Sequence, residues 1–273
     1  MTDHRPIGVF DSGVGGLTVL AALREVLPNE SLLYLGDTAR VPYGNKGADT
    51  IQRYARGAVR FLVERDVKAV VVACNTASAY ALPGIADEWE IPIIGVIEPV
   101  ANAAVASSRS GHIGVIGTRA TVRSGAYVRA IERAGQTHIV PLQQPCPLFV
   151  PLAEEGWTQG PIVEAVASEY LSAFQGSAID TLILGCTHYP LLKVTITQTL
   201  QRLMGRSVEV LDSATATAAY VQEALRRQKA LRQTESNASV VYFVTDEPQR
   251  FADTGAPFLN DPLEHVEHID LVT

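Results

Sequence analysis

Short apolar runs recur along the chain, and between them apolar positions repeat with the spacing of amphipathic helices. Such runs are typical of buried parallel strands. The expected strands are Ile7–Phe10, Ser31–Leu35, Ala69–Ala73, Pro92–Ile97, Ile113–Ile116, Thr181–Leu184, Glu209–Leu211 and Val240–Val244. The expected helices include Leu17–Leu27, Thr50–Arg65, Val122–Ala134, Pro161–Phe174 and Leu191–Leu203. Because strands and helices alternate, the pattern predicts an α/β fold built on parallel sheets.

The pattern is interrupted at Glu98-Pro99, in the proline-rich segment Gln143–Pro151 and around Gly205. A chain of 273 residues is long enough for two small domains. We expect the first domain to comprise residues 1–97 together with 209–273, and the second to comprise residues 98–208. The last segment of the chain would thus return to the first domain.

Two segments of the chain, Ala69–Ser78 and Thr181–Pro190, follow the same plan. In each, an expected strand ends at a cysteine, a small or polar residue follows, and a helix is expected to begin. Cys74 and Cys186 would then lie at the carboxyl ends of their strands, where open α/β sheets usually bind ligands. The alternative is that the match reflects only the repetitive order of strands and helices in α/β proteins.

Cys74 and Cys186 are the strongest candidates for chemistry. A thiol beside a helix N-terminus can have a pKa below its ordinary value of about 8.5, which leaves some thiolate at neutral pH. Most free cysteines are instead small buried hydrophobic residues, and we assign Cys146, which lies between two prolines, to packing. His188 follows Cys186 by two residues, where it can hold or supply a proton.

The first turn, Gly8–Leu17, follows an expected strand and opens a helix, and its glycines can expose backbone N–H groups to an anion. Its glycine order does not match the GxGxxG dinucleotide fingerprint, and the chain has no GxxxxGK[ST] phosphate loop, so neither a nicotinamide cofactor nor nucleotide phosphate transfer is expected. Asp11 in this turn suits an ammonium group or a proton relay. It also suits a helix N-cap, and spacing does not decide between these roles.

Polar residues follow both thiols and also line a loop after an expected strand. Asn75–Thr76 and Thr187–His188 offer donors that can hold a carboxylate, or that simply cap their own helices. The loop Leu35–Gly44 is rich in residues with special chemistry, and such loops carry function disproportionately. Its aromatic residue, Tyr43, suits either a ligand contact or packing.

Composition narrows the class of protein. The formal net charge is -7 and no basic block is present, which argues against nucleic acid as a partner. No apolar run approaches the roughly 20 residues that span a bilayer, and the start of the chain does not resemble a signal peptide, so we expect a cytoplasmic protein without membrane contact. The three cysteines form no CxxC pair, so we expect free thiols and no zinc site.

Taken together, these residues resemble the cofactor-independent aspartate/glutamate racemase family. The motifs that carry the resemblance are Gly8–Val19, Leu35–Gly44, Ala73–Ser78 and Leu184–Leu191, with further support from Cys146–Gly156 and the acidic segment Glu264–Glu267. They extend over nearly the whole chain. The DSGVGG turn and the PYG loop resemble the glutamate-specific members.

The resemblance implies two doubly wound α/β domains of similar plan with an active site in the cleft between them. It implies interconversion of L- and D-glutamate without pyridoxal phosphate or a metal, a homodimer as in many members, and a supply of D-glutamate for bacterial peptidoglycan. Cys74 and Cys186 would transfer the protons, supported by Asp11, Glu154 and His188. The implied substrate contacts are Asp11, Ser12, Tyr43, Gly44, Asn75, Thr76, Thr187 and His188. Glu155 lies beside Glu154, and a shift of one residue would exchange the two.

Racemisation removes a proton from one face of the α-carbon and returns one on the other, so one cysteine must be thiolate while the other is thiol. The pH profile should therefore be bell-shaped. The nearest alternative is the same chemistry on aspartate. Another is a non-catalytic protein that binds an acidic amino acid, and the weakest is a structural or interaction protein.

Overall fold

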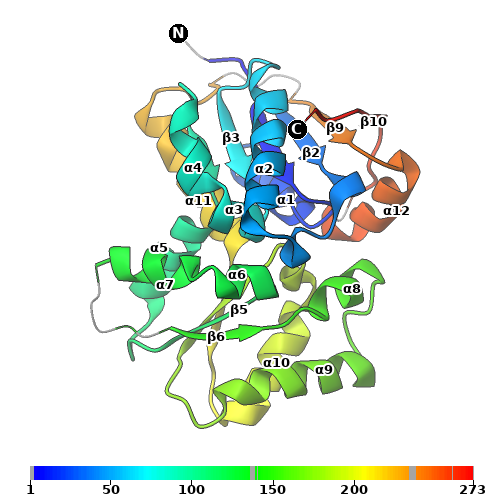
Figure 1. Cartoon of the computed structure of the whole chain (residues 1–273). Coiled ribbons are helices and arrows are strands. Elements are labelled where there is room, and N and C mark those ends of the chain that lie inside the picture. Colours follow the sequence, from blue (N-terminus) through cyan, green and yellow to red (C-terminus); the bar gives the residue numbers. More distant parts are fainter. Residues whose placement is uncertain (1–2, 136–138, 140, 234–237, 260, 273) are drawn as a thin grey trace. The chain divides into compact units, whose positions relative to one another are not determined.

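The computed structural model describes residues 3–135, 139, 141–233, 238–259 and 261–272. The chain divides into two compact units, of which the first is Met1–Val96 with Ala214–Thr273 and the second is Ile97–Ser213. Each unit is built on a single parallel sheet with helices packed against it (Figure 1). The expected α/β class with two parallel sheets is confirmed.

The first unit contains a six-stranded sheet in the order β10-β9-β2-β1-β3-β4, and every pair of neighbours is parallel. The strands are β1 (Ile7–Asp11), β2 (Leu32–Gly36), β3 (Ala69–Val72), β4 (Ile93–Gly95), β9 (Val240–Val244) and β10 (Val266–His268). Every residue of β1 and β3 is buried, as expected for central strands that are covered on both faces. On one face, Phe10, Val70 and Val72 pack in a core with apolar residues of the following helices.

The helices of the first unit are α1 (Leu17–Val26), α2 (Ala48–Val63), α3 (Asn75–Tyr80), α4 (Leu82–Ile85), α11 (Ser213–Arg227) and α12 (Pro248–Leu259). Three single-turn 3-10 helices, η1 (Thr38–Arg40), η2 (Tyr43–Asn45) and η3 (Ala86–Glu88), lie in its loops. In α2 the apolar residues Ile51, Ala55, Ala58 and Leu62 recur at helical spacing and are fully buried. That stripe explains why this segment packs as a helix against the sheet.

The second unit contains a four-stranded parallel sheet in the order β6-β5-β7-β8. The strands are β5 (Ile113–Gly117), β6 (Leu142–Pro145), β7 (Thr181–Gly185) and β8 (Glu209–Asp212). The helices are α5 (Ile97–Ser107), α6 (Arg119–Arg123), α7 (Ala126–Arg133), α8 (Phe149–Glu154), α9 (Pro161–Leu171), η4 (Ser172–Phe174), η5 (Tyr189–Leu192) and α10 (Lys193–Met204). The central strands β5 and β7 are completely buried.

The second unit continues past the boundary expected at residue 208. Strand β8 pairs with β7, with Val210 beside Leu182, so residues up to Asp212 belong to the smaller sheet, and the second unit ends at Ser213. At the other boundary, β4 ends at Gly95 and Ile97 already begins α5. The expected strand Pro92–Ile97 is therefore too long, because its last apolar residue is helical.

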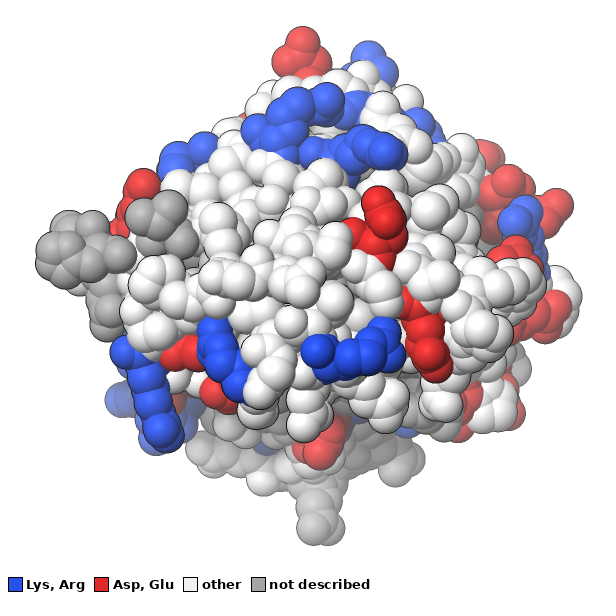
Figure 2. All heavy atoms as spheres, turned by 90° about the horizontal axis from the view of Figure 1, so that it is seen from below, with Lys and Arg blue, Asp and Glu red and all other residues white. Residues whose placement is uncertain are grey.

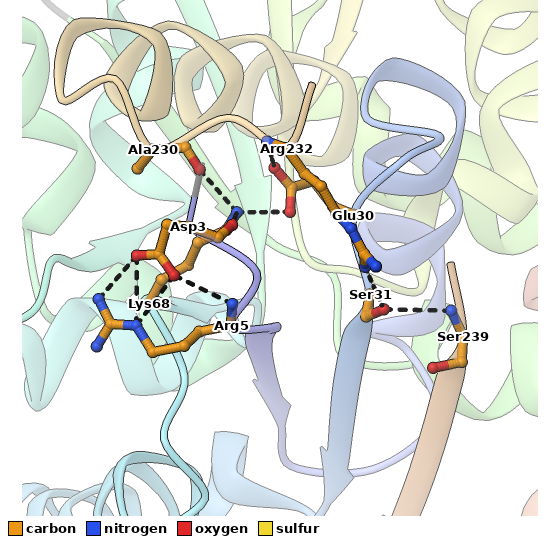
Figure 3. A network of polar contacts seen from close by, with 8 residues as sticks. All are labelled: Asp3, Arg5, Glu30, Ser31, Lys68, Ala230, Arg232 and Ser239. Carbon is orange, nitrogen blue, oxygen red and sulfur yellow. Dashed lines mark hydrogen bonds and ion pairs between the residues drawn. The ribbon is translucent and has the colours of Figure 1, made fainter. Parts of the chain in front are cut away.

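A buried polar network lies at the amino ends of the strands in the first unit (Figure 3). Lys68 Nζ lies 2.6 Å from a carboxylate oxygen of Glu30, and the two side chains are 1% and 2% exposed. The Lys68 ammonium also donates to the carbonyl oxygens of Asp3 and Ala230, at 3.1 and 2.8 Å. The network thereby joins the start of the chain, two strand starts and the segment that follows α11.

Charged side chains of both signs lie interspersed among uncharged residues on the face shown in Figure 2, so neither sign dominates that face. None of the described helices has both the length and the apolar character needed to cross a membrane.

Candidate active site

In the first unit, the expected site residues gather where neighbouring strands end. Asp11 ends β1 beside Gly36 of β2, and Phe10 of β1 lies beside Val72 of β3. Because all three strands run in the same direction, the residues that follow them share the carboxyl edge of the sheet. This geometry places the β1 turn next to the turn that carries Cys74.

The Asp11 carboxylate shapes the β1 turn. Asp11 is fully buried, and one carboxylate oxygen accepts a hydrogen bond from Gly13 N at 2.8 Å. Helix α1 begins only at Leu17, and Gly16 precedes it without a side-chain cap. The alternative of Asp11 as the N-cap of α1 is therefore wrong. The turn is tight, because a Cβ atom on Gly16 would lie 2.4 Å from the Asp11 Cβ.

Tyr34 supports the same turn and is absent from the residues expected from the sequence. Its buried hydroxyl donates to the Gly13 carbonyl at 2.8 Å, and burial raises its pKa, so the hydroxyl stays protonated. The available signal was a hydroxyl within the otherwise apolar strand β2.

Cys74 is the N-cap of α3, and its sulfur accepts from Ala77 N at 3.5 Å. The Ser12 hydroxyl lies 3.5 Å from the same sulfur, and Cys74 is 6% exposed. The thiol thus donates to a hydroxyl oxygen while its sulfur accepts from a backbone N–H. Because the sulfur caps α3, Thr76 lies inside the helix, and the alternative that Thr76 caps it is wrong. Asn75 and Thr76 are both buried beside the thiol.

The Leu35–Gly44 loop leads into η2, which begins at Tyr43. The Tyr43 hydroxyl donates to the Asp37 carboxylate at 2.6 Å, and the ring lies 6.2 Å from that of Phe10. Burial and the neighbouring Asp37 charge raise the pKa of Tyr43, so its hydroxyl remains protonated. The Tyr43 side chain is thus held within the first unit, while Gly44 is partly exposed beside it.

In the second unit, Cys186 follows β7 and is 6% exposed. His188 Nδ1 lies 3.8 Å from the Cys186 sulfur, and the Thr187 hydroxyl oxygen lies 3.5 Å from the same nitrogen. The next helical turn, η5, begins at Tyr189 after His188, so Thr187 does not occupy its N-cap position. The chain therefore turns back on itself here and directs an imidazole at the thiol.

Glu154 contacts the ring nitrogen of His188 that does not face Cys186. His188 Nε2 lies 2.9 Å from Oε1 of Glu154, the last residue of α8, whose side chain is 42% exposed. Of the two neighbouring glutamates, Glu154 is therefore the one that contacts His188. Burial lowers the pKa of His188, but the hydrogen bonds and charges of Cys186 and Glu154 outweigh that effect and raise it to about 10. His188 is therefore an imidazolium at neutral pH, placed to donate to the thiol.

Cys146 lies in the same unit but in a different environment. It is fully buried in the apolar core, and its thiol donates to the Gln144 carbonyl at 3.5 Å. Burial, followed by the charge of Cys186, raises the pKa of the Cys146 thiol, which disfavours its thiolate. Cys146 fits a packing role.

Comparison with known proteins places this chain in a family. The family model for Asp/Glu/Hydantoin racemase matches residues 16–221. The chain belongs to the Asp/Glu/hydantoin racemase family. It is thus related to racemases, which are isomerases, as the motifs around Cys74 and Cys186 suggest.

Similar relatives within the racemase family include glutamate racemases. The glutamate racemase of Geobacter metallireducens is 49% identical over 267 residues, which cover 98% of this chain and 97% of the relative. The crystal structure of the Francisella tularensis glutamate racemase in complex with D-glutamate has a TM-score of 0.90 at 41% identity, with 98% of both chains covered. The Bacillus anthracis glutamate racemase isoform RacE1 has a TM-score of 0.92 at 36% identity, again with 98% of both covered.

The residues expected at the racemase site fall into two groups, one at the carboxyl edge of each sheet. The group in the first unit comprises Asp11, Ser12, Tyr43, Gly44, Cys74, Asn75 and Thr76. The group in the second unit comprises Glu154, Cys186, Thr187 and His188. Each group thus offers one thiol with polar neighbours. Among the residues that the structure describes, no group of three or more His, Cys, Asp and Glu side chains is placed to hold a metal ion.

Thr118 is a further polar residue outside the expected set, and it follows β5, the strand next to the one that Cys186 follows. Gly117 at the end of β5 lies beside Gly185 of β7, so the next residues in register are Thr118 and Cys186. Ser12 stands in the same relation to Cys74 in the first unit. The sequence repeat around Cys74 and Cys186 does not identify Thr118 by itself, because the match between Ser12 and Thr118 depends on which strands are neighbours in each sheet.

Proposed function

We propose that this protein interconverts L- and D-glutamate, with Cys74 and Cys186 as the two acid/base groups at the α-carbon. The observation that carries the proposal is the matched environment of the thiols, each following a central buried strand and each with hydrogen-bonding groups at its sulfur. The glutamate racemases that cover nearly all of this chain support glutamate as the substrate.

The proposed reaction starts with one sulfur as thiolate and the other as thiol. The thiolate removes the α-proton from one face, and the thiol on the other side returns its proton to the planar carbanion. Reversal of these roles converts the opposite enantiomer. Because both protonation states are needed at once, activity falls at low pH, where both sulfurs are protonated, and at high pH, where neither is.

His188 and Glu154 would support Cys186. As an imidazolium, His188 can stabilise the Cys186 thiolate after proton donation and can return a proton to it. The Glu154 carboxylate holds the other ring nitrogen and so fixes the direction of Nδ1 toward the sulfur. At Cys74, the sulfur accepts from Ala77 N and the thiol donates to the Ser12 hydroxyl oxygen.

The remaining polar residues would bind the substrate. We assign the α-ammonium group to Asp11, whose carboxylate is the buried anion of the first turn. The hydroxyl, amide and backbone donors beside the thiols would hold the carboxylates and stabilise the charge that develops during proton removal. These residues are Ser12, Tyr43, Gly44, Asn75, Thr76, Thr187 and His188.

The test is turnover of enantiopure substrates followed by circular dichroism. L-glutamate and D-glutamate should each lose ellipticity until the mixture is racemic, and enantiopure aspartate should react far more slowly. Cys74→Ala and Cys186→Ala should each abolish the signal change. Faster turnover of aspartate than of glutamate would show that aspartate, and not glutamate, is the substrate. Binding of glutamate without turnover, unaffected by either substitution, would identify a binding protein instead.

We further propose that the protein works in the cytoplasm as a homodimer and supplies D-glutamate for peptidoglycan. Several large apolar side chains of the second unit are about half exposed, which suits a surface for a second copy. They are Leu148, Trp157, Ile162 and Val194. Light scattering should give about twice the 29.3 kDa mass of one chain, and a monomer at micromolar concentration would contradict the homodimer.

A further inference from the structure

Asp37 is the centre of a buried hydrogen-bond cluster behind the Tyr43 turn. Its side chain is fully buried and accepts from the Tyr43 hydroxyl at 2.6 Å, from Arg40 Nη1 at 2.8 Å and from the Thr245 hydroxyl at 2.9 Å. Arg40 and Tyr43 follow Asp37 in the same loop, and Thr245 comes directly after β9. A carboxylate held by three donors is a fixed point to which the loop is attached.

Arg40 connects this cluster to the C-terminal segment. While Nη1 donates to Asp37, Nη2 donates to the carbonyl oxygen of Leu271 at 2.8 Å. Leu271 is buried in the same apolar cluster as Tyr43. A planar guanidinium can reach two acceptors at fixed angles, which a lysine ammonium cannot reproduce. Arg40 therefore links Asp37 to Leu271, although these two residues lie more than 200 positions apart in the sequence.

We propose that Arg40 is a positioning residue for the racemisation. By donating hydrogen bonds to both Asp37 and the Leu271 carbonyl, Arg40 fixes the Tyr43–Asn45 turn in the geometry that binds substrate. The inference rests on the proposed function, because it takes Tyr43 and Gly44 as substrate contacts. The proposal also gives the C-terminal segment a role, because its Leu271 carbonyl helps to hold Arg40 in place beside the turn.

A purely structural role for Arg40 predicts a different result. In that case Arg40 only neutralises the buried Asp37 charge, and any cation would serve. Arg40→Lys keeps the positive charge but loses the planar guanidinium that reaches two acceptors at once, so this substitution separates charge neutralisation from positioning. The matched control is Arg53→Met, because the Arg53 guanidinium also lies over the Tyr54 ring, at 5.3 Å against 5.2 Å for Arg40, yet bonds neither Asp37 nor Leu271.

The experiment measures glutamate kinetics and amide exchange on the full-length variants. Arg40→Lys should raise KM about tenfold with a smaller change in kcat, because a misplaced contact weakens substrate binding. It should also speed exchange of the Lys46 amide, which donates to the Tyr43 carbonyl across the turn. Arg53→Met should match the wild type in both measurements.

A second pair of variants tests the backbone contact. A chain that ends at Ile269 loses the Leu271 carbonyl, whereas Leu271→Ala loses the side chain and keeps the carbonyl. The shortened chain should show the raised KM and the faster Lys46 exchange, and Arg40→Lys should add little to it, since both changes remove one interaction. Leu271→Ala should lower thermal stability alone.

Wild-type KM and wild-type Lys46 exchange in Arg40→Lys would overturn the positioning role. If the wild-type protein does not racemise glutamate, the proposed function fails. The exchange measurement still decides in that case whether Arg40 holds the turn.

Discussion

His188 sets how the second half-site responds to pH, because its buried ring lies between the Cys186 sulfur and the Glu154 carboxylate. Its pKa of about 10 lies above the ordinary value of 6.5. A group whose pKa is raised by folding contributes stability that is fully present below the unfolded-state pKa and is lost as pH rises through the folded-state pKa. The contribution of His188 should therefore disappear between about pH 6.5 and 10.

We expect the free energy of unfolding to fall more steeply over this range in the wild type than in His188→Asn. The asparagine variant cannot bind the extra proton, so it lacks that part of the pH dependence. Urea unfolding at pH 6.5, 8 and 9.5 measures the difference. Parallel pH profiles for the two proteins would show that His188 is not charged in the folded state.

Glu154 and Glu155 provide a matched pair. Glu154→Gln keeps the size of the side chain but removes the charge that faces His188. Because the Glu154 side chain is 42% exposed, solvent screens the pair, and we expect its loss to cost about 1 kcal/mol, or roughly fivefold in rate. We expect kcat for glutamate to fall about fivefold and the basic limb of the pH profile to shift to lower pH. Glu155→Gln should retain kcat within about twofold. Equal effects of both substitutions would contradict the role of Glu154.

Residue type and position beside a strand end were enough to predict where the two thiols, Asp11 and His188 lie in the fold. The surroundings of Tyr34, Arg40 and Thr118 depend on which strands become neighbours and on where residues near Leu271 pack. That information comes from tertiary pairing and is absent from local patterns. For the same reason the sequence could not decide between capping and other roles for Thr76, which the start of α3 resolves.

Among the elements, the central strands were predictable because both of their faces are buried, which leaves a continuous apolar run. Strands β6 and β10 were not predicted, because each lies at a sheet edge and its residues are partly or fully exposed. The expected helix Val122–Ala134 is two helices, α6 and α7. Gly125 separates them with a φ of 65°, a left-handed conformation that interrupts a right-handed helix.

The β1–α1 turn offers a test at the scale of elements. Gly16→Ala introduces a Cβ that would lie 2.4 Å from the Asp11 Cβ and 2.9 Å from the Tyr34 hydroxyl, so the turn must move. We expect a loss of about 1–3 kcal/mol in unfolding free energy together with loss of activity. Gly84→Ala meets no atom within 4 Å and should keep stability and activity. A fully active Gly16→Ala protein would refute the claim that this turn is rigidly packed.

At the scale of the whole molecule, the Lys68–Glu30 pair lies at the amino ends of the strands in the first unit (Figure 3). Lys68 also contacts Asp3 and Ala230, so it connects segments that are far apart in the sequence. Lys68→Met leaves the Glu30 carboxylate buried without its cation, which typically costs about 3–5 kcal/mol. The double variant Lys68→Met/Glu30→Leu removes both charges and should recover much of that loss. Urea unfolding compares the three proteins, and a single variant within about 1 kcal/mol of the wild type would mean that water reaches the pair.

The central claim is that two thiols serve one α-carbon, and hydrogen exchange in D2O tests it most directly. Cys74→Ser and Cys186→Ser should both fail to racemise glutamate. Each should still exchange the α-proton of one enantiomer, because its remaining thiol can remove and return a proton on one face, and the two variants should differ in which enantiomer exchanges. Exchange of both enantiomers by a single variant, or racemisation by either one, would contradict the account.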